Sequence, residues 1–385
     1  MSQKNPLAWV VVAIVLMSRC LFAALSTNGQ KTDRPDSNTW RLAEPIRYEN
    51  LSVFPVVSSR SANTGGFSTL YEALGAGEAV VTESGGDVMQ RSRDGRPVAI
   101  PEHRGASVNQ LVLINRGSRP LILLAGELVS GGKQDRIISK DRIVPAGAEP
   151  LPLDVFCVEQ GRWSSGAQFS AGKLMVHPSV REKAAVDREQ SKVWAAVRSG
   201  TTSGSGIAGG PGSSSSAPAG QATLPPRIIT GIASAEAPTQ SYQRIYQSSQ
   251  VGNSADPFVD EIQGHFARHI AELKGQAVVG VVVAYGGDMA WADIFASSAL
   301  FERYWPKLLR SYVVEALVRP QTKEQASLDD AREFLRPLAG RESIESEPDV
   351  YSLRQVTQGR YVEIEFEALR PANITLHTLK IHRTS

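Results

Sequence analysis

The stretch from Asn109 to Trp163 decides the predicted fold, and its sequence is NQLVLINRGSRPLILLAGELVSGGKQDRIISKDRIVPAGAEPLPLDVFCVEQGRW. Short apolar runs alternate here with turns that contain Gly, Pro and charged residues. Residues 110–115 and 121–125 predict two strands of a β-hairpin around the turn 116–119. Several short strands joined by tight turns are typical of an antiparallel sandwich or a barrel-like sheet.

A pair of glycines, Gly131-Gly132, is followed in this stretch by Lys133, Gln134 and Arg136. Successive backbone N–H groups at a glycine turn can form an anion-binding nest, and the side chains that follow could contact a phosphate or carboxylate. The alternative is a hairpin loop with a solvated charged flank. The spacing of Gly, Lys and Ser differs from that of a phosphate-binding Walker loop.

Residues 157–163, CVEQGRW, hold a thiol, an acid, a guanidinium and an indole. On a strand, Glu159 would project from the same face as Cys157. A Cys nucleophile needs a base and an oxyanion site, and no His is tied to this thiol, so a small buried hydrophobe is the alternative. Arg162 and Trp163 could form a stacking and charged floor for a nucleotide-like ligand, or could be structural partners of nearby acids.

Two further acids and one His pair have the residue types of functional groups. Glu127 and Asp293 are candidate general bases. The neighbours of Asp293 are apolar, so its carboxylate points into a cleft or caps the following helix. His265 and His269 are four residues apart, a spacing that can bind a metal. No third ligand is identifiable, so we expect a solvated helix face, and the sequence predicts no metal or cofactor.

The N-terminal 25 residues are predicted to be a signal peptide, because Lys4 precedes the apolar run 7–17 and small residues follow it. An uncleaved anchor and a lipoprotein acylated at Cys20 are the alternatives, and Arg19 argues against both. We therefore expect an exported protein, periplasmic or extracellular, that contacts a membrane only through this segment if it is uncleaved. Once Lys4 and Arg19 are set aside, 39 basic residues balance 39 acidic residues, so no nucleic-acid partner is expected.

Composition divides the rest of the chain into four segments. These are a flexible lead-in (26–45), a β-rich N-terminal part (46–198), a Gly/Ser-rich linker or insertion (199–250) and an α+β C-terminal part (251–385). The prediction is thus an α+β fold, in which an antiparallel, sandwich-like β-rich part packs with an α+β part.

Local patterns predict the elements of these segments. Pro55 in the strand 51–57 indicates an edge position or a bend. Ser68 and Ser179 are predicted to cap helices over 68–75 and 179–197. The C-terminal part is predicted to contain helices at 256–273, 298–318 (with a bend at Pro306) and 328–338, and strands at 276–284, 289–295, 350–356, 360–368 and 374–382.

Four segments resemble the bacterial ARG and rhodanese-phosphatase-superfamily-associated protein domain, in which ARG stands for ADP-ribosylglycohydrolase. They are YENLSVFPV, VNQLVLINRGSRPLILLAGELVSGGKQDRIIS, VPAGAEPLPLDVFCVEQGRW and ADIFASSALFERYWPKLLRSYVVEAL. The resemblance covers roughly Arg47 to Leu317 and implies an association with ADP-ribose and phosphate-processing proteins, without a defined activity. It directs attention to Glu127, Lys133, Gln134, Arg136, Cys157, Glu159, Arg162, Trp163, Asp293, Trp305 and Lys307.

We expect a binding module for a phosphate- or nucleotide-like group, with an unknown small anionic ligand or a protein as its partner. The candidate ligand-binding residues are Lys133, Gln134, Arg136, Arg162 and Trp163. The first alternative is a hydrolase or transferase acting on an ADP-ribose-like or phosphorylated substrate. Its base would be Glu127, Glu159 or Asp293, or its nucleophile Cys157. The second is a structural envelope scaffold, so the sequence leaves open whether the protein is an enzyme.

Overall fold

The computed structural model describes most of the chain after residue 39. The described ranges are 40–83, 90–91, 97–98, 109–159, 163, 166–202, 242–243, 249–273, 276–319, 321–370 and 373–383. All of them fall within one compact unit, Pro35–Ser385. The predicted signal peptide and most of the predicted linker lie outside the described residues. Among the described helices, none is long and apolar enough to cross a membrane.

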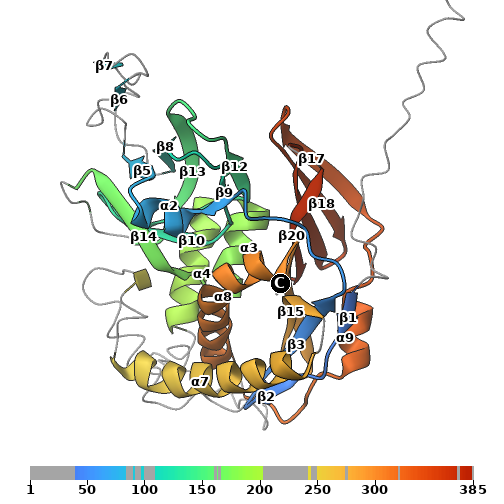
Figure 1. Cartoon of the computed structure of the whole chain (residues 1–385). Helices are drawn as coiled ribbons and strands as arrows, with labels where there is room; N and C mark the ends of the chain where they lie inside the picture. The colour runs from blue at the N-terminus through green and yellow to red at the C-terminus, as the bar shows by residue number, and fades with distance from the viewer. Residues whose placement is uncertain are drawn as a thin grey trace, which may run out of the picture. The chain divides into compact units, whose positions relative to one another are not determined.

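A nine-stranded antiparallel sheet is the largest structure in the described residues (Figure 1). Its order is β1-β3-β15-β16-β20-β19-β18-β17, and β2 also pairs with β3. The strands are β1 (Trp40–Leu42), β2 (Ile46–Tyr48), β3 (Leu51–Ser58), β15 (Ala277–Tyr285), β16 (Asp288–Phe295), β17 (Arg341–Glu347), β18 (Tyr351–Gln358), β19 (Tyr361–Ala368) and β20 (Ile374–His382). Strand β1 thus lies inside the lead-in predicted to be flexible.

Strand β3 is interior, so the prediction that Pro55 marks an edge strand is wrong. It pairs with β15 on one side and with β1 and β2 on the other. The carbonyl of Pro55 accepts from Ala43 N, in the gap between β1 and β2. The N–H that proline lacks would point to the same side as that carbonyl. Proline is tolerated there because two short strands, and not one continuous strand, line that side.

Helices cover both faces of this sheet. Val53 and Val283 point to the face covered by α7 (Ser249–Glu272) and α8 (Ser298–Val318). Phe54 and Val282 point to the opposite face, where they pack in one cluster with Phe334 of α9 (Leu328–Phe334). Alternate residues of β3 and β15 are therefore buried on both faces, which explains their continuous apolar sequences.

Six strands of the β-rich N-terminal part form a closed antiparallel barrel, one of the two architectures expected, whereas β2 and β3 of that part belong to the nine-stranded sheet. The strand order of the barrel is β10-β11-β13-β8-β5-β14. The strands are β5 (Ala79–Thr82), β8 (Gln110–Asn115), β10 (Glu127–Gly131), β11 (Arg136–Ile138), β13 (Leu151–Cys157) and β14 (Gln168–Met175). A second apolar cluster, which includes Val81, Leu113, Val129 and Val155, joins side chains from several of these strands.

The predicted hairpin of 110–115 with 121–125 is wrong. Strand β8 pairs with β13 and β5, whereas β9 (Leu121–Leu123) pairs with β12 (Arg142–Val144) and β4 (Ser68–Thr69) in a separate sheet. The Asn115 amide donates to the carbonyls of Arg119, Val144 and Pro145. These bonds hold the turn after β8 in a loop that leads out of the barrel.

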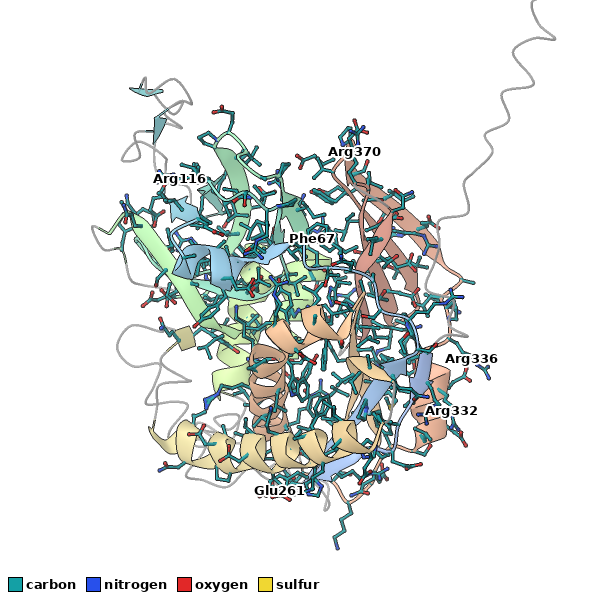
Figure 2. The ribbon with its side chains drawn as sticks, viewed as in Figure 1. Phe67, Arg116, Glu261, Arg332, Arg336 and Arg370 are labelled. Carbon is teal, nitrogen blue, oxygen red and sulfur yellow. The ribbon has the colours of Figure 1, made fainter. Side chains whose placement is uncertain are left out.

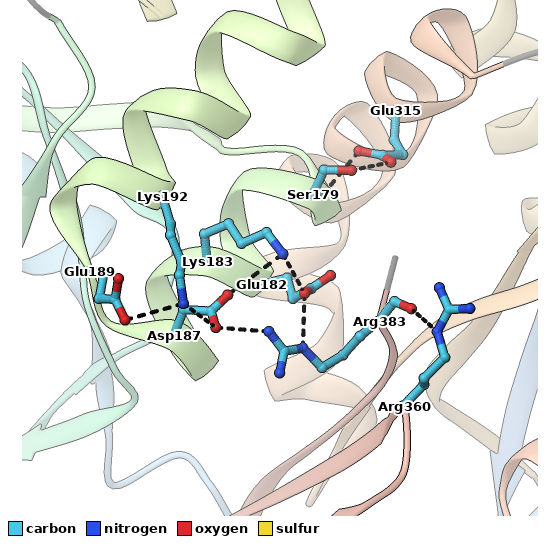
Figure 3. Close-up of polar contacts among 9 residues, drawn as sticks. All are labelled: Ser179, Glu182, Lys183, Asp187, Glu189, Lys192, Glu315, Arg360 and Arg383. Carbon is cyan, nitrogen blue, oxygen red and sulfur yellow. Dashed lines mark hydrogen bonds and ion pairs between the residues drawn. The ribbon is translucent and has the colours of Figure 1, made fainter. Parts of the chain in front are cut away.

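Both predicted serine caps are wrong. Thr69 caps α2 (Leu70–Gly75) in a capping box with Glu72. The helix predicted from Ser179 is split into α3 (Pro178–Glu182), a π-helical turn (Lys183–Asp187) and α4 (Gln190–Thr202). Arg188 lies between them with a left-handed φ of 54°. Arg383 of the C-terminal segment donates to Glu182 and Asp187, so it ties this interrupted helix to the end of β20 (Figure 3).

The predicted α+β class with antiparallel sheets is confirmed. The turn at 286–287 between β15 and β16, helix α8 and the last three strands are all present close to their predicted bounds. Strand β17 and the short pair β6 (Gln90–Arg91) and β7 (Pro97–Val98) were not predicted. Helix α7 begins at Ser249, so Pro257 lies inside it and is not its first residue.

Candidate functional site

Asp293 on β16 is the centre of a buried polar cluster, and its side chain has no solvent exposure. Arg181 Nη1 of α3 donates to both carboxylate oxygens, at 2.8 and 2.9 Å. Trp291 Nε1 donates at 2.7 Å and Tyr312 Oη of α8 also donates. His377 of β20 contacts Asp293 Oδ1 through Nε2 at 2.8 Å. Together with Asp141, these residues form what we call the Asp293 cluster.

His377 carries a proton on both ring nitrogens. Its Nδ1 lies 2.6 Å from Asp141 Oδ2 and its Nε2 lies 2.8 Å from Asp293 Oδ1. Burial would lower the pKa of His377, but Asp141 and Asp293 outweigh burial and raise it. Burial would likewise raise the pKa of Asp293, but Arg181 and His377 hold it well below its ordinary value. Two carboxylates and two cations therefore balance inside the protein.

The same buried region contains Glu127, the first residue of β10. Its Oε1 accepts from Lys307 Nζ of α8 at 2.9 Å, and its Oε2 accepts from Leu124 N at 2.9 Å. Asp141 Oδ1 accepts from the next amide, Ala125 N, at 2.8 Å. Two carboxylates thus hold consecutive N–H groups of one loop, which links Glu127 to the Asp293 cluster.

Gly126 allows that loop to pass Arg181 closely. It has a φ of +87°, and a Cβ added to it would lie 2.8 Å from Arg181 Cγ. Arg181 Nε donates to Ala125 O at 2.8 Å. The glycine in the sequence LLAGE is therefore explained by the close approach of this loop to Arg181 of the Asp293 cluster.

The glycine turn of β10–β11 already binds carboxylates of the protein itself. Lys133 N donates to Glu83 Oε1, and Gly131 N donates to Asp135 Oδ1 at 3.0 Å. Asp135 N donates in turn to Glu159 Oε2 at 3.1 Å. Gly132 N donates to Gln168 O at 2.9 Å, so the N–H groups that could have formed an anion nest are bonded within the protein, and Glu159 is 3% exposed.

Cys157 is fully buried at the end of β13. Its Sγ donates to Gln134 Oε1 at 3.1 Å, and its backbone N and O both bond to the Gln190 side chain. Burial raises the pKa of this thiol. A protonated, enclosed thiol is a poor nucleophile.

The four described members of the predicted ligand-binding set do not converge on one surface. Gln134 and Arg136 point inward and are buried. Lys133 Nζ lies 4.7 Å from the ring centroid of Trp163, which is 53% exposed, so these two side chains do meet. Arg162 lies outside the described residues. Ligand binding by this set stays a prediction.

Trp305 and His265, two further positions singled out in the sequence, make contacts within the protein. Trp305 of α8 is buried and stacks on Phe266 of α7, with ring centroids 4.5 Å apart. His265 contacts Glu261 at 2.7 Å on the exposed side of α7. Within the described part of the chain, no three His, Cys, Asp or Glu side chains are placed to hold a metal ion.

A cleft of about 310 Å³ lies where α9 meets β1. We call it the arginine cleft, and it is lined by Trp40, Arg41, Leu42, Arg332, Leu335, Arg336 and Pro337. Figure 2 shows Arg332 and Arg336 close together beside β1. Among the described residues each pairs with an acid three residues before it, Arg332 with Asp329 at 2.6 Å and Arg336 with Glu333 at 2.9 Å. No carboxylate is among the lining residues.

Sequence inspection missed the arginine cleft and most of the Asp293 cluster. Trp40 and Arg332 are far apart in the sequence, and the packing of α9 against β1 brings them together. The sequence offers one local signal for the residues of this cluster, which is a polar residue among apolar neighbours on a strand, as at His377 in β20. The same signal correctly drew attention to Asp293.

The fold and the buried cluster define an α+β protein with a closed six-stranded barrel and a nine-stranded antiparallel sheet within one compact unit. The ARG and rhodanese-phosphatase-superfamily-associated protein domain, ARPP-1, matches residues 39–384, and the chain belongs to this family. The match covers all the described residues, so the barrel and the sheet both belong to the family domain. No curated protein and no solved structure matches the chain.

Proposed function

We propose that the protein is a binding module for a phosphate-bearing, nucleotide-like ligand, and that the arginine cleft holds the phosphate. The observation that supports this most is the meeting of Arg332 and Arg336 around one hollow beside the indole of Trp40. Guanidinium groups match phosphate oxygens in bidentate geometry, and a Trp ring can stack on a planar group or a cation.

The present partners of these arginines are easily exchanged. The Asp329–Arg332 and Glu333–Arg336 pairs lie on the solvent side of α9, where the side chains of both arginines are more than half exposed. Exposed ion pairs contribute about 0–1 kcal/mol. A phosphate with two or more negative charges would therefore compete successfully for the guanidinium groups of Arg332 and Arg336.

The burial and hydrogen bonds of the carboxylates predicted as catalytic bases favour binding over catalysis. Glu127, Glu159 and Asp293 are buried, and each accepts hydrogen bonds from groups inside the protein. A general base must reach a substrate proton within hydrogen-bond distance. The contacts of these acids instead hold the fold together, which supports a protein that recognises its ligand without transforming it.

Calorimetric titration with pyrophosphate tests the proposal. The variant carrying both Arg332→Gln and Arg336→Gln should lose at least tenfold in affinity, because each lost charge-assisted contact weakens binding by about 1.5–3 kcal/mol. Arg370→Gln is the matched control, since Arg370 is also exposed and pairs only with Asp349 at 2.9 Å. Equal affinities in all three proteins would reject the arginine cleft.

The separate set around Lys133 and Trp163 is tested in the same titration. Lys133→Gln should leave pyrophosphate affinity within twofold if the arginine cleft is the site. A tenfold loss in this variant, with no loss in the double arginine variant, would move the site to the glycine turn.

We also propose that the protein acts outside the cytoplasm, which residues 1–25 support by their basic start, apolar run and small residues. Fractionation of cells that express the full chain, with mass measurement of the recovered protein, tests this. Recovery from the cytoplasm at full length would contradict export.

A further inference from the structure

A second hollow, of about 520 Å³, adjoins the arginine cleft. Arg336 and Pro337 line both, so the segment after α9 forms their common wall. We call this hollow the ring cavity. It is lined by Gly287, Asp288, Met289, Asp330, Glu333, Phe334, Arg336, Pro337, Leu338, Gln358, Tyr361, Lys380 and His382. Its volume is within the range of small-molecule sites, about 300–1,000 Å³.

A flat aromatic wall closes one part of the ring cavity. Tyr361 and His382 are stacked with ring centroids 4.6 Å apart and an interplanar angle of 13°. Tyr361 is nevertheless 38% exposed and lines the ring cavity, so part of its ring is available to another planar group. Phe334 adds a buried apolar surface and lies 6.2 Å from Tyr361, centroid to centroid. Such a lining suits a planar ring.

The polar atoms of the ring cavity include free acceptors. His382 Nδ1 lies 3.1 Å from Met289 O, and a carbonyl can only accept, so Nδ1 carries the proton. In the neutral ring Nε2 is then an acceptor, and no described residue donates to it. Asp288, which is exposed, adds carboxylate oxygens. These atoms call for hydrogen-bond donors on the ligand, such as an amino group.

Lys380 fixes the wall between the two hollows. It is 2% exposed and its Nζ donates to Glu363 Oε2 at 3.0 Å and to the carbonyl of Arg336. Its charge is thus neutralised by Glu363, and its bond to the backbone of Arg336 holds the residue that both hollows share. One ligand can therefore contact both sites across a fixed distance.

We infer that the ring cavity binds the planar, amino-bearing ring of the ligand whose phosphate the arginine cleft holds, which makes that ligand a nucleotide with an amino-substituted base. This inference rests on the proposed function for its phosphate site. The ring stacks on Tyr361, and its amino group donates to His382 Nε2 or Asp288. Stacking of a base on an aromatic side chain contributes about 1–3 kcal/mol, or roughly five- to 150-fold in affinity.

Calorimetric titrations with AMP, IMP, adenosine and pyrophosphate test the two sites separately. IMP is the matched probe, because it differs from AMP at the position where a carbonyl replaces the amino group. We expect AMP to bind at least fivefold more tightly than IMP. His382→Phe keeps the ring stack but removes the acceptor, so it should reduce this preference while leaving pyrophosphate affinity unchanged.

Tyr361→Leu should weaken adenosine and AMP at least fivefold without changing pyrophosphate affinity. Tyr71→Leu is the matched control, since Tyr71 is 41% exposed on α2 and does not line the ring cavity. Pyrophosphate binding with no further gain for AMP would overturn the ring cavity and leave the proposed phosphate site standing. Adenosine binding that depends on Tyr361, with no pyrophosphate binding, would support the ring cavity and reject the phosphate site.

Discussion

Replacement of His377 by glutamine tests whether the Asp293 cluster holds the fold together. The imidazolium makes two hydrogen bonds to carboxylates, at 2.6 and 2.8 Å, and a hydrogen bond to a charged group contributes about 1.5–3 kcal/mol. Its loss would also leave Asp141 and Asp293 buried with Arg181 as the one cation of the cluster. Removing one partner of a buried pair destabilises a protein by about 3–5 kcal/mol. We expect a loss of this size in the free energy of unfolding.

The stabilising contribution of His377 depends on pH. Its folded-state pKa is raised by Asp141 and Asp293, so the folded state holds the proton more tightly than the unfolded chain. That contribution is fully present below the unfolded pKa of about 6.5 and is lost as the pH rises through the folded pKa. In between, stability should fall by up to about 1.4 kcal/mol per pH unit.

The contribution of His177 to stability depends on pH with the opposite sign, so the two histidines can be separated by the direction of the change. Burial lowers its pKa against the opposing effect of Glu315, so its contribution is present above about pH 6.5 and is lost as the pH falls through its folded pKa. A decline in stability as the pH rises above about 6.5 consequently reports on His377.

Chemical denaturation followed by tryptophan fluorescence, at several values in this pH window, measures both effects. The slope should be present in the natural protein and absent from the His377→Gln variant. His265→Gln is the control, because this exposed side chain on α7 contacts Glu261 only, and it should change stability by no more than about 0.5 kcal/mol. A loss below about 1 kcal/mol for His377→Gln, with the slope retained, would refute the bridging role of the imidazolium.

Three other predictions concern the interior. Gly126→Ala should destabilise by about 1–3 kcal/mol in chemical denaturation, because its φ is +87° and a Cβ has no room. The control is Gly264→Ala, in open space on α7, which should instead stabilise by roughly 0.5–1 kcal/mol. Equal effects of the two substitutions on stability would be inconsistent with this reasoning. Cys157 should react with a thiol reagent at least 100-fold faster after denaturation, and rapid native labelling would show an accessible thiolate. Glu127→Gln should lose about 3–5 kcal/mol, and most of it should return when Lys307→Met is added; no recovery would mean that the two charges are not coupled.

Elements made by neighbouring residues were predictable from the sequence. The apolar runs on either side of the glycine turn at 286–287 predicted β15 and β16, and the spacing of apolar residues predicted α8 with its bounds. Both signals are local, because a turn and a helix are made by bonds between nearby residues. The place of β15 beside β3 in one sheet had no such signal, since these two strands are more than 200 residues apart in the sequence.

The failed hairpin shows where local reasoning stops. Strands β8 and β9 follow each other across a short turn, which normally predicts pairing. The Asn115 amide instead bonds to three carbonyls, two of them near residue 145. The partners of the turn are thus supplied by a later part of the chain. A side chain that satisfies distant backbone groups can redirect a strand that its own sequence would send back to its neighbour.

The candidate acids illustrate the same limit for function. An acid among apolar residues, such as Asp293, predicts that a carboxylate is buried, but burial alone does not separate a catalytic base from a structural ion pair. The partners of the carboxylate distinguish these two roles, and here they are Arg181 and His377, which come from other elements. The arginine cleft is the reverse case, since Arg332 and Arg336 look like an ordinary solvated helix surface until β1 places Trp40 beside them. In this fold the residues that attract attention in the sequence hold the interior, and the proposed binding groups are among the residues that do not.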